Sequence, residues 1–292
     1  MDFLEYFDED FNFDQVSYDL DQSIPVDEYE GYTKAEIQAA LYSIFSEKSP
    51  VRVRKDIPGR ILDQLPFFRL SEYLLDTVAK TGEVKLTKFG NLPVKLVKHL
   101  YEQKFIREPM IEEGFYKLHK EEDSITINIS HLILKFAGLL KRRNNKLSLT
   151  QKGIKTKSDR VELLRVILAT FALRFNWASL DGYGNSRTGQ FGVGFTLLML
   201  NKYGNEFRKS GFYSDKYMIA FPALLDDFLI NSFYKYGDVE RDFTRCFSIR
   251  TFEKYLEYFN LIEMEYEGDS LLLKKSFVKT SALFHSVFVF DS

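Results

Sequence analysis

The sequence predicts a mainly α protein, with a central helical bundle and small winged-helix-like helix–hairpin units on either side. Three observations predict this class. Apolar residues make up 45% of the 292 residues, enough to bury a large core. Apolar side chains recur at helical spacing in several long segments. Two hairpin signals, one at Asn144-Asn145 and one at Gly268-Asp269, each follow a helical segment, which is the pattern of a winged helix.

Capping and turn residues justify the elements in order. Thr33 and Glu36 have the spacing of a capping box and open the first helix. Asn91 is the expected N-cap of a later helix that has Pro93 in its first turn, where a missing N–H costs nothing. Ser248 is expected to cap the last long helix. The expected helices after the first span 62–80, 92–103, 130–140, 161–175, 189–203, 214–233 and 248–259, and the expected strands include 84–86, the two arms of each hairpin and 283–290.

These elements divide the chain into four expected regions. An acidic aromatic N-terminal arm covers 1–30, and a helical region with a winged-helix-like unit covers 31–157. The central helical bundle spans 158–236. A C-terminal helix–hairpin unit, also winged-helix-like, spans 237–292.

Charge is distributed unevenly between these regions. Of the 42 Asp and Glu residues, eleven lie in 1–30, which has no Lys or Arg, so 31 acids remain against 40 bases. Residues 85–160 carry seventeen bases and eight acids, which accounts for the whole positive excess. Two interpretations of the arm stay open: an extended segment that docks through its aromatic residues, or a disordered acidic tail. A docked arm would compete with nucleic acid for the basic stretch. The aromatic residues in question are Phe3, Phe7, Phe11 and Phe13.

The basic hairpin 141–146 is the candidate nucleic-acid site, because a wing presents cations to the phosphate backbone. An ordinary solvated basic face is the alternative. The candidate nucleic-acid-binding residues are Lys95, Lys98, Lys141, Arg142, Arg143, Lys146, Lys152 and Lys155.

The loop after residue 175 is the candidate small-molecule site. It holds the only Trp of the chain beside several polar side chains, and a pocket needs an apolar wall with a few convergent polar groups. A turn held by Asn and Asp side chains over a buried indole is the alternative. The candidate ligand-binding residues are Asn176, Trp177, Asp181, Tyr183 and Arg187.

Other site chemistries find little support. Four scattered His and one Cys predict no metal site and no cofactor, and no nucleophile motif predicts a catalytic residue. The glycines of Gly189-Gln-Phe-Gly-Val-Gly194 predict close helix packing rather than a phosphate cradle. A single Cys, an acidic start and no long apolar run lead us to expect a cytoplasmic protein with no membrane partner. The oligomeric state stays open.

Two segments resemble a poorly characterised group of bacterial proteins. They are Leu86-Thr-Lys-Phe-Gly-Asn-Leu-Pro-Val-Lys-Leu-Val-Lys and Phe175-Asn-Trp-Ala-Ser-Leu-Asp-Gly-Tyr. In that group an LTxxGNL segment precedes a helical region with a FNWAxxDGY-like stretch. The resemblance covers residues 60–230 and implies a bacterial origin and a common fold, with no established activity. Some members carry a cysteine-rich zinc-binding tail, which this chain lacks.

Together these observations predict a non-enzymatic interaction or regulatory protein that binds DNA through its basic winged-helix-like face. A protein–protein interaction module without nucleic acid is one alternative. A small-molecule binder or enzyme centred on the Trp177 loop is the other.

Overall fold

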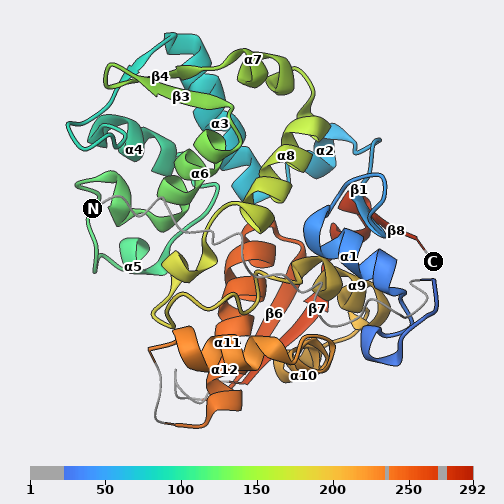
Figure 1. The fold of residues 1–292 in the computed structure, drawn as a ribbon. Helices are drawn as coiled ribbons and strands as arrows, with labels where there is room; N and C mark the ends of the chain where they lie inside the picture. Colours follow the sequence, from blue (N-terminus) through green and yellow to red (C-terminus); the bar gives the residue numbers. More distant parts are fainter. Residues whose placement is uncertain (1–22, 234–236, 269–274, 292) are drawn as a thin grey trace.

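The computed structural model describes residues 23–233, 237–268 and 275–291. Within these residues the chain is mainly helical, as predicted, and holds three small antiparallel sheets (Figure 1). Buried apolar side chains form one cluster that extends along the chain from Ile37 to Phe288. The last three expected regions therefore share a core.

The first long element confirms its capping signal. Helix α1 (Lys34–Tyr42) begins at Thr33, whose hydroxyl accepts a 3.2 Å hydrogen bond from the Glu36 N–H while the Glu36 carboxylate accepts one of 2.8 Å from the Thr33 N–H. A one-turn 3-10 helix, η2 (Asp27–Tyr29), precedes it. Strand β1 (Val51–Val53) follows and pairs with β8 (Phe288–Phe290) near the other end of the chain.

Residues 66–149, named the N-terminal unit here, follow the order helix, strand, helix, helix, strand, strand. The three strands form an antiparallel sheet in the order β2-β4-β3. Short helices stand before the unit and between its second and third long helices: α2 (Gly59–Leu62), α5 (Pro109–Glu112) and η3 (Glu121–Asp123). The unit itself consists of α3 (Pro66–Thr81), β2 (Val84–Lys85), α4 (Val94–Tyr101), α6 (Ile125–Phe136), β3 (Leu140–Arg143) and β4 (Lys146–Leu149).

Three helix starts in this unit differ from the prediction. Helix α3 begins at Pro66 rather than at residue 62, and residues 59–62 form the separate helix α2. The N-cap of α4 is Pro93, and the Asn91 side chain instead donates a 2.6 Å hydrogen bond to Glu122. Helix α6 begins at Ile125, five residues early, because the Ser124 hydroxyl caps it. The predicted hairpin turn is confirmed: Asn144 and Asn145 have φ of 50° and 56°, which Asn tolerates better than most residues.

Helices α7 (Gln151–Lys157) and α8 (Arg160–Leu173) lead out of the N-terminal unit, and α8 packs against α6. The 3-10 turn η4 (Trp177–Leu180) follows.

Residues 193–280, named the C-terminal unit here, follow the order of the N-terminal unit with one additional helix, Ala223–Asn231, before a third helix formed by residues 239–259. Their sheet has the order β5-β7-β6, which corresponds strand for strand to β2-β4-β3. Strand β5 lies within the expected central bundle, and β7 lies within the expected C-terminal unit. Their pairing crosses the expected boundary at residue 237 and joins the two regions in one sheet. The elements are α9 (Val193–Tyr203), β5 (Arg208–Lys209), α10 (Ser210–Ala220), α11 (Ala223–Asn231), α12 (Val239–Phe247), η5 (Ser248–Leu256), η6 (Glu257–Phe259), β6 (Ile262–Glu267) and β7 (Lys275–Thr280), and α13 (Phe284–Val287) precedes β8.

Further boundaries were predicted wrongly. Helix α9 begins at Val193 rather than at 189, and α10 begins at Ser210 rather than at 214. Pro222 separates α10 from α11 where one helix was expected, because proline cannot donate the helical hydrogen bond. The cap of the last long helix is Asp238, and Ser248 lies inside the helix, where α12 continues into the wider turns of η5. Residues 284–287 form a helical turn before the terminal strand. The second hairpin turn at Asp269 lies outside the described residues.

The glycines at 189–194 serve close packing, as predicted. A Cβ at Gly194 would overlap the Ala40 carbonyl, so this glycine lets α9 approach α1. No helix in the described part of the chain is long and apolar enough to cross a membrane.

Candidate nucleic-acid interface

The outward face of the β2-β4-β3 sheet carries four cations. Side chains alternate between the faces of a strand, and the register pairs Lys85 with Lys146 and Arg143 with Lys146. Lys141 lies opposite Ser148 on the same face, whereas Val84, Leu147 and Leu140 point into the core. Lys85, Lys141, Arg143 and Lys146 are all exposed, and we call them the basic sheet face.

Acidic neighbours of the basic sheet face are few. Lys146 forms a 2.6 Å ion pair with Glu83. Within the described ranges, Lys85, Lys141 and Arg143 form no ion pair at 4.0 Å or less. Three of the four cations therefore have no carboxylate partner among the described residues.

Arg142 belongs to the opposite side of the hairpin. It donates a 3.0 Å hydrogen bond to Asn145 and lies over Gly90, where a Cβ would overlap its guanidinium. Gly90 has a φ of +90°, which favours glycine. The absence of a side chain at Gly90 also leaves room for the Arg142 guanidinium. Lys135 of α6 lies nearby. Burial, the largest cause, and the charge of Arg142 lower the pKa of Lys135, whereas the charge of Glu121 acts in the opposite direction.

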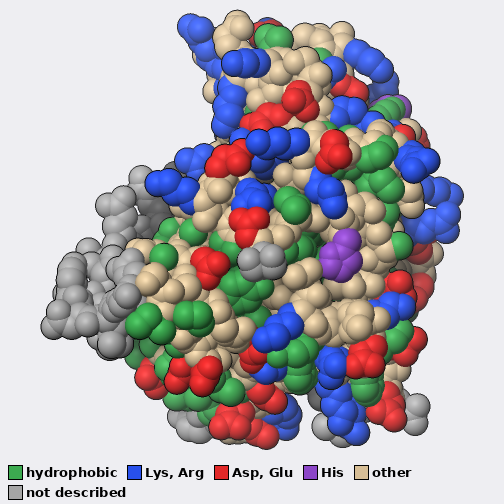
Figure 2. Space-filling model, turned by 90° about the vertical axis from the view of Figure 1, so that its right-hand side faces the viewer, with side chains coloured by type: hydrophobic (Ala, Val, Ile, Leu, Met, Phe, Trp, Pro, Cys, Tyr) green, Lys and Arg blue, Asp and Glu red, His purple; other side chains and the backbone are tan. Residues whose placement is uncertain are grey.

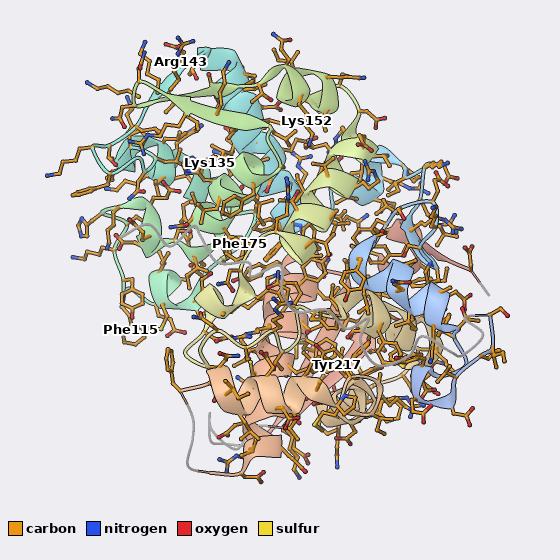
Figure 3. The ribbon with its side chains drawn as sticks, viewed as in Figure 1. Phe115, Lys135, Arg143, Lys152, Phe175 and Tyr217 are labelled. Atoms are coloured by element: carbon orange, nitrogen blue, oxygen red, sulfur yellow. The ribbon has the colours of Figure 1, made fainter. Side chains whose placement is uncertain are left out.

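The remaining candidate cations surround this hairpin. Lys95 and Lys98 are exposed on α4, and Lys155 is exposed on α7. Lys152 donates a 2.7 Å hydrogen bond to the Ala137 carbonyl and so satisfies the C-terminus of α6. Figure 3 shows Arg143 at the free end of the hairpin and Lys152 on α7.

The charges form a regional pattern on the surface. Figure 2 shows Lys and Arg predominating over the upper part of the visible face, at the level of β3, β4 and α7 in Figure 1. Asp and Glu gather along the lower edge of the same face. The sequence stretch 85–160 therefore maps to one end of the molecule.

Helix α6 is not available for contact with bases. Ile125 is its only exposed residue, and the helix packs against α3, α4 and α8. Its single cation, Lys135, is half-buried. A helix that enters the major groove needs exposed polar side chains that reach base edges, and α6 offers none.

The Trp177 loop is packed into the core. Trp177 is fully buried, its indole N–H donates a 2.7 Å hydrogen bond to the Phe171 carbonyl, and its ring contacts Tyr255 at a centroid distance of 5.0 Å. Asn176 caps η4 by accepting a hydrogen bond from the Ala178 N–H. These contacts match the alternative of a pinned turn over a buried indole.

Arg250 from η5 organises the polar side of this loop. Its guanidinium is fully buried and forms a bidentate pair with Asp181 at 2.6 and 3.0 Å. The same group donates to the carbonyls of Gly184, Ser186 and Thr188, so all its N–H groups are used. Tyr183 and Arg187 are half-buried in the same loop, where the Arg187 N–H donates to Asp227. The ligand-binding interpretation stays a prediction, although the geometry favours a structural role.

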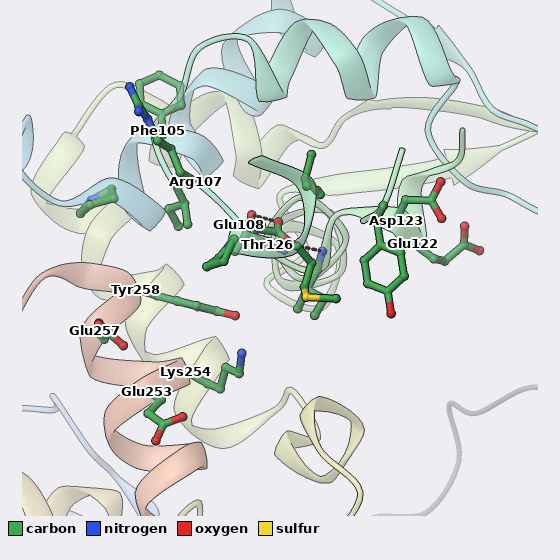
Figure 4. Close-up of a pocket in the computed structure, with 17 residues that line it drawn as sticks. Phe105, Arg107, Glu108, Glu122, Asp123, Thr126, Glu253, Lys254, Glu257 and Tyr258 are labelled. Carbon is green, nitrogen blue, oxygen red and sulfur yellow. Dashed lines mark hydrogen bonds between the residues drawn. The ribbon is translucent and has the colours of Figure 1, made fainter. Parts of the chain in front are cut away.

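A cleft of about 700 Å³ lies where the N-terminal unit meets η5 and η6 (Figure 4). Glu108 lies in it and accepts hydrogen bonds from Thr126, Ser124 and the Ile125 N–H, so it occupies the positive N-terminus of α6. Burial and the neighbouring Glu253 raise the pKa of Glu257. The described lining residues include no Cys, His or Ser.

Residues 23–30 of the acidic arm contact the C-terminal unit rather than the basic sheet face. The Glu30 carboxylate accepts hydrogen bonds from Lys202, Tyr203 and Lys216. Burial alone would raise the pKa of Glu30, but the bonds from Lys216, Tyr203 and Lys202 lower it to about 2. Residues 1–22, including Phe3, Phe7, Phe11 and Phe13, lie outside the described residues, so competition by the arm stays a hypothesis.

Two residues of the interface were missed in the sequence. Lys85 stands between Val84 and Leu86, and this alternation marks it as outward-facing. Phe89 is 75% exposed in the turn before α4, beside Lys88. An aromatic residue between a Lys and a Gly in a turn is the signal that could have identified it.

No cluster of three or more His, Cys, Asp or Glu in the described ranges could hold a metal ion. Cys246 lies in the last turn of α12 and is buried, which raises its pKa and keeps the thiol neutral. A scan against protein-family models, a search of curated proteins and a search of solved structures found no match for this chain.

Proposed function

We propose that this protein is a non-enzymatic interaction or regulatory protein that binds the phosphate backbone of nucleic acid through a winged-helix-like N-terminal unit. The observation that carries the proposal is the basic sheet face, where Lys85, Lys141, Arg143 and Lys146 share one side of the sheet. The element order and the sheet order β2-β4-β3 support the winged-helix description of the unit.

The mode of binding follows from the burial of α6. A buried third helix leaves backbone contacts as the main source of affinity, and such contacts carry no sequence information. We therefore propose binding that is strongly salt-dependent and tolerant of sequence. The hairpin would supply the contacts, with Lys95, Lys98 and Lys155 extending the surface.

We propose that the C-terminal unit is a second winged-helix-like unit that does not bind nucleic acid. The outward face of its sheet carries Glu263, Glu265 and Glu267 on the edge strand β6, and Lys209, Lys275 and Lys279 on the other two strands. The carboxylates offset the three lysines, one of them through the Glu263–Lys279 ion pair, so this face lacks the net positive charge that attracts a phosphate backbone. Binding should therefore be confined to the N-terminal unit.

The test is fluorescence anisotropy with a random duplex of about 20 base pairs, at about 50 and about 200 mM salt. The variant Lys141→Ala/Arg143→Ala should bind more weakly and lower the salt slope by about 1.8, because each duplex phosphate contact contributes about 0.9. The matched control is Lys209→Ala/Lys275→Ala, which removes two exposed cations from the outward face of the other sheet.

A control that binds as weakly as the first variant would contradict the site. The absence of salt-sensitive binding by the unaltered chain would contradict the function. In that case a protein-interaction module is the better proposal, since the acidic β6 forms the edge of its sheet and could pair with a basic partner strand.

A further inference from the structure

The turn between β2 and α4 presents an aromatic ring beside the basic hairpin. Phe89 is 75% exposed, and the Lys88 ammonium lies 4.9 Å from the centroid of its ring. Single exposed apolar residues are common on protein surfaces. Phe89 differs because it lies within the most basic part of the molecule.

The turn holds Phe89 in a defined position. The Gly90 N–H donates a 2.9 Å hydrogen bond to the Thr87 carbonyl, and the Thr87 N–H donates one of 2.8 Å to the Asn91 carbonyl. Asn91 in turn donates its backbone N–H to the Thr87 hydroxyl at 3.1 Å. A ring on such a closed turn loses little conformational freedom when a ligand stacks on it.

The turn is also tied to the tip of the hairpin. The Leu86 N–H donates to the Asn145 carbonyl at 2.9 Å, and the Asn145 amide donates back to the Leu86 carbonyl at 2.9 Å. Arg142 extends from the hairpin over Gly90. Phe89 therefore lies next to Lys88, directly precedes Gly90, over which Arg142 lies, and follows Lys85 of the basic sheet face by four residues.

We propose that Phe89 is a stacking platform, and that the preferred ligand of the N-terminal unit is single-stranded nucleic acid. Single strands are bound by grooves that combine cations for the backbone with aromatic rings on which bases stack. Bases inside a duplex are already stacked and cannot reach an exposed ring, whereas an unpaired base can. The burial of α6 agrees with this ligand, because single-strand binding needs no helix in the major groove. This inference rests on the proposed function and adds the class of its ligand.

The test compares an oligo(dT) or oligo(U) strand with a duplex of the same length. We expect the unaltered protein to bind the single strands more tightly at equal salt. Phe89→Ala should weaken single-strand binding by about 5- to 100-fold, the range of one lost base–aromatic stack, and leave duplex binding within about twofold. Phe115→Ala is the control, because Phe115 is 68% exposed outside the hairpin region.

A second variant reports stacking directly. Phe89→Trp should keep single-strand affinity, and its fluorescence should be quenched by unlabelled oligo(dT). The only native Trp, Trp177, is fully buried and gives a constant background.

The outcomes separate the two proposals. Salt-sensitive duplex binding with equal affinities of Phe89→Ala and the unaltered chain for oligo(dT), and no quenching in Phe89→Trp, overturns the stacking inference alone. If neither the unaltered protein nor any of the variants binds either ligand, the proposed function is overturned and this inference with it. A preference of oligo(U) over oligo(dT) would support the inference and indicate RNA as the source of the strand.

Discussion

The N-terminal and C-terminal units share an order of elements and a strand order, yet their outward sheet faces differ in net charge. The first is positive through Lys85, Lys141, Arg143 and Lys146. The second balances three Glu on its edge strand against three Lys on the other two strands: Glu263, Glu265, Glu267, Lys209, Lys275 and Lys279. Both third helices are largely buried. The comparison teaches that the arrangement of elements supplies a scaffold, while a few outward-facing positions on three short strands decide what each unit can contact.

The units also differ in the polar group buried on the third helix. In the N-terminal unit, His131 bonds Glu121 at 2.7 Å and its Nε2 has no partner among the described residues. In the C-terminal unit, Arg250 is permanently charged and every donor is satisfied. The second arrangement fixes its surroundings more tightly, because removing either charge leaves the other buried and unpaired.

The largest expected effect comes from breaking this arrangement in the C-terminal unit. Arg250→Met should lower the free energy of unfolding by about 3–5 kcal/mol, since Asp181 would stay buried without its counter-charge. Urea denaturation followed by circular dichroism measures this. Arg241→Ala on the same long helix removes an exposed cation and should change stability by less than about 0.5 kcal/mol. A loss below about 1 kcal/mol for Arg250→Met would show that the pair does not organise the loop.

A smaller effect is expected where the arm meets the C-terminal unit. The pKa of Glu30 is about 2 in the folded protein against 4.5 as the ordinary value, so its stabilisation is complete above about pH 4.5 and is lost as the pH falls towards 2. Across that window the unaltered chain should lose about 2–3 kcal/mol relative to Glu30→Gln. Unfolding free energies at pH 6 and near pH 3 (about 1.5 units below the ordinary value) test this. Parallel pH profiles for the two proteins would refute the role of the carboxylate.

The smallest effect is expected from an experiment that moves the cationic binding face from the N-terminal unit to the C-terminal unit. In the Lys141→Ala/Arg143→Ala background, Glu263→Lys/Glu265→Lys should restore duplex affinity by about tenfold, or about 1.4 kcal/mol. Anisotropy at low salt measures it, with Glu263→Gln/Glu265→Gln as the control for lost repulsion alone. If the Lys and Gln variants bind equally, the outward charges are not what separates the two units.

The sequence correctly predicted the helix start and the hairpin turn that depend on interactions between neighbouring residues. The capping box at Thr33 and the turn at Asn144-Asn145 depend on side chains within a few residues, and both are confirmed. Strand β5 has two residues, and only its pairing with β7, some 70 residues later, makes it a strand. Ser248 resembled a cap because its partner, the Ser276 hydroxyl 3.3 Å away, cannot be identified from the neighbouring sequence.

The candidate interface was visible in the sequence as a set of cations but not as a surface. Which side of the hairpin each residue occupies follows from the register, which separates Arg142 from Lys141 and Arg143. The local sequence around Phe89 marks an aromatic residue in a turn, but its position beside the hairpin depends on the long-range bonds between Leu86 and Asn145. The Trp177 loop is a further case: the Asp181 carboxylate and the Gly184 carbonyl are bound by Arg250, which lies far along the chain and is not indicated by the sequence of the loop.

The pairing of β1 with β8 has a consequence for the time course of synthesis. Arg52 and Asp291, which form an ion pair beside these strands, are 239 residues apart in the sequence. At about 5–20 residues per second a ribosome needs roughly 10–50 s to make the intervening chain, so Val51 and Val53 wait unpaired for that period. A nascent chain that stops before residue 288 would keep this edge exposed, and quality-control proteases would recognise it as unfinished.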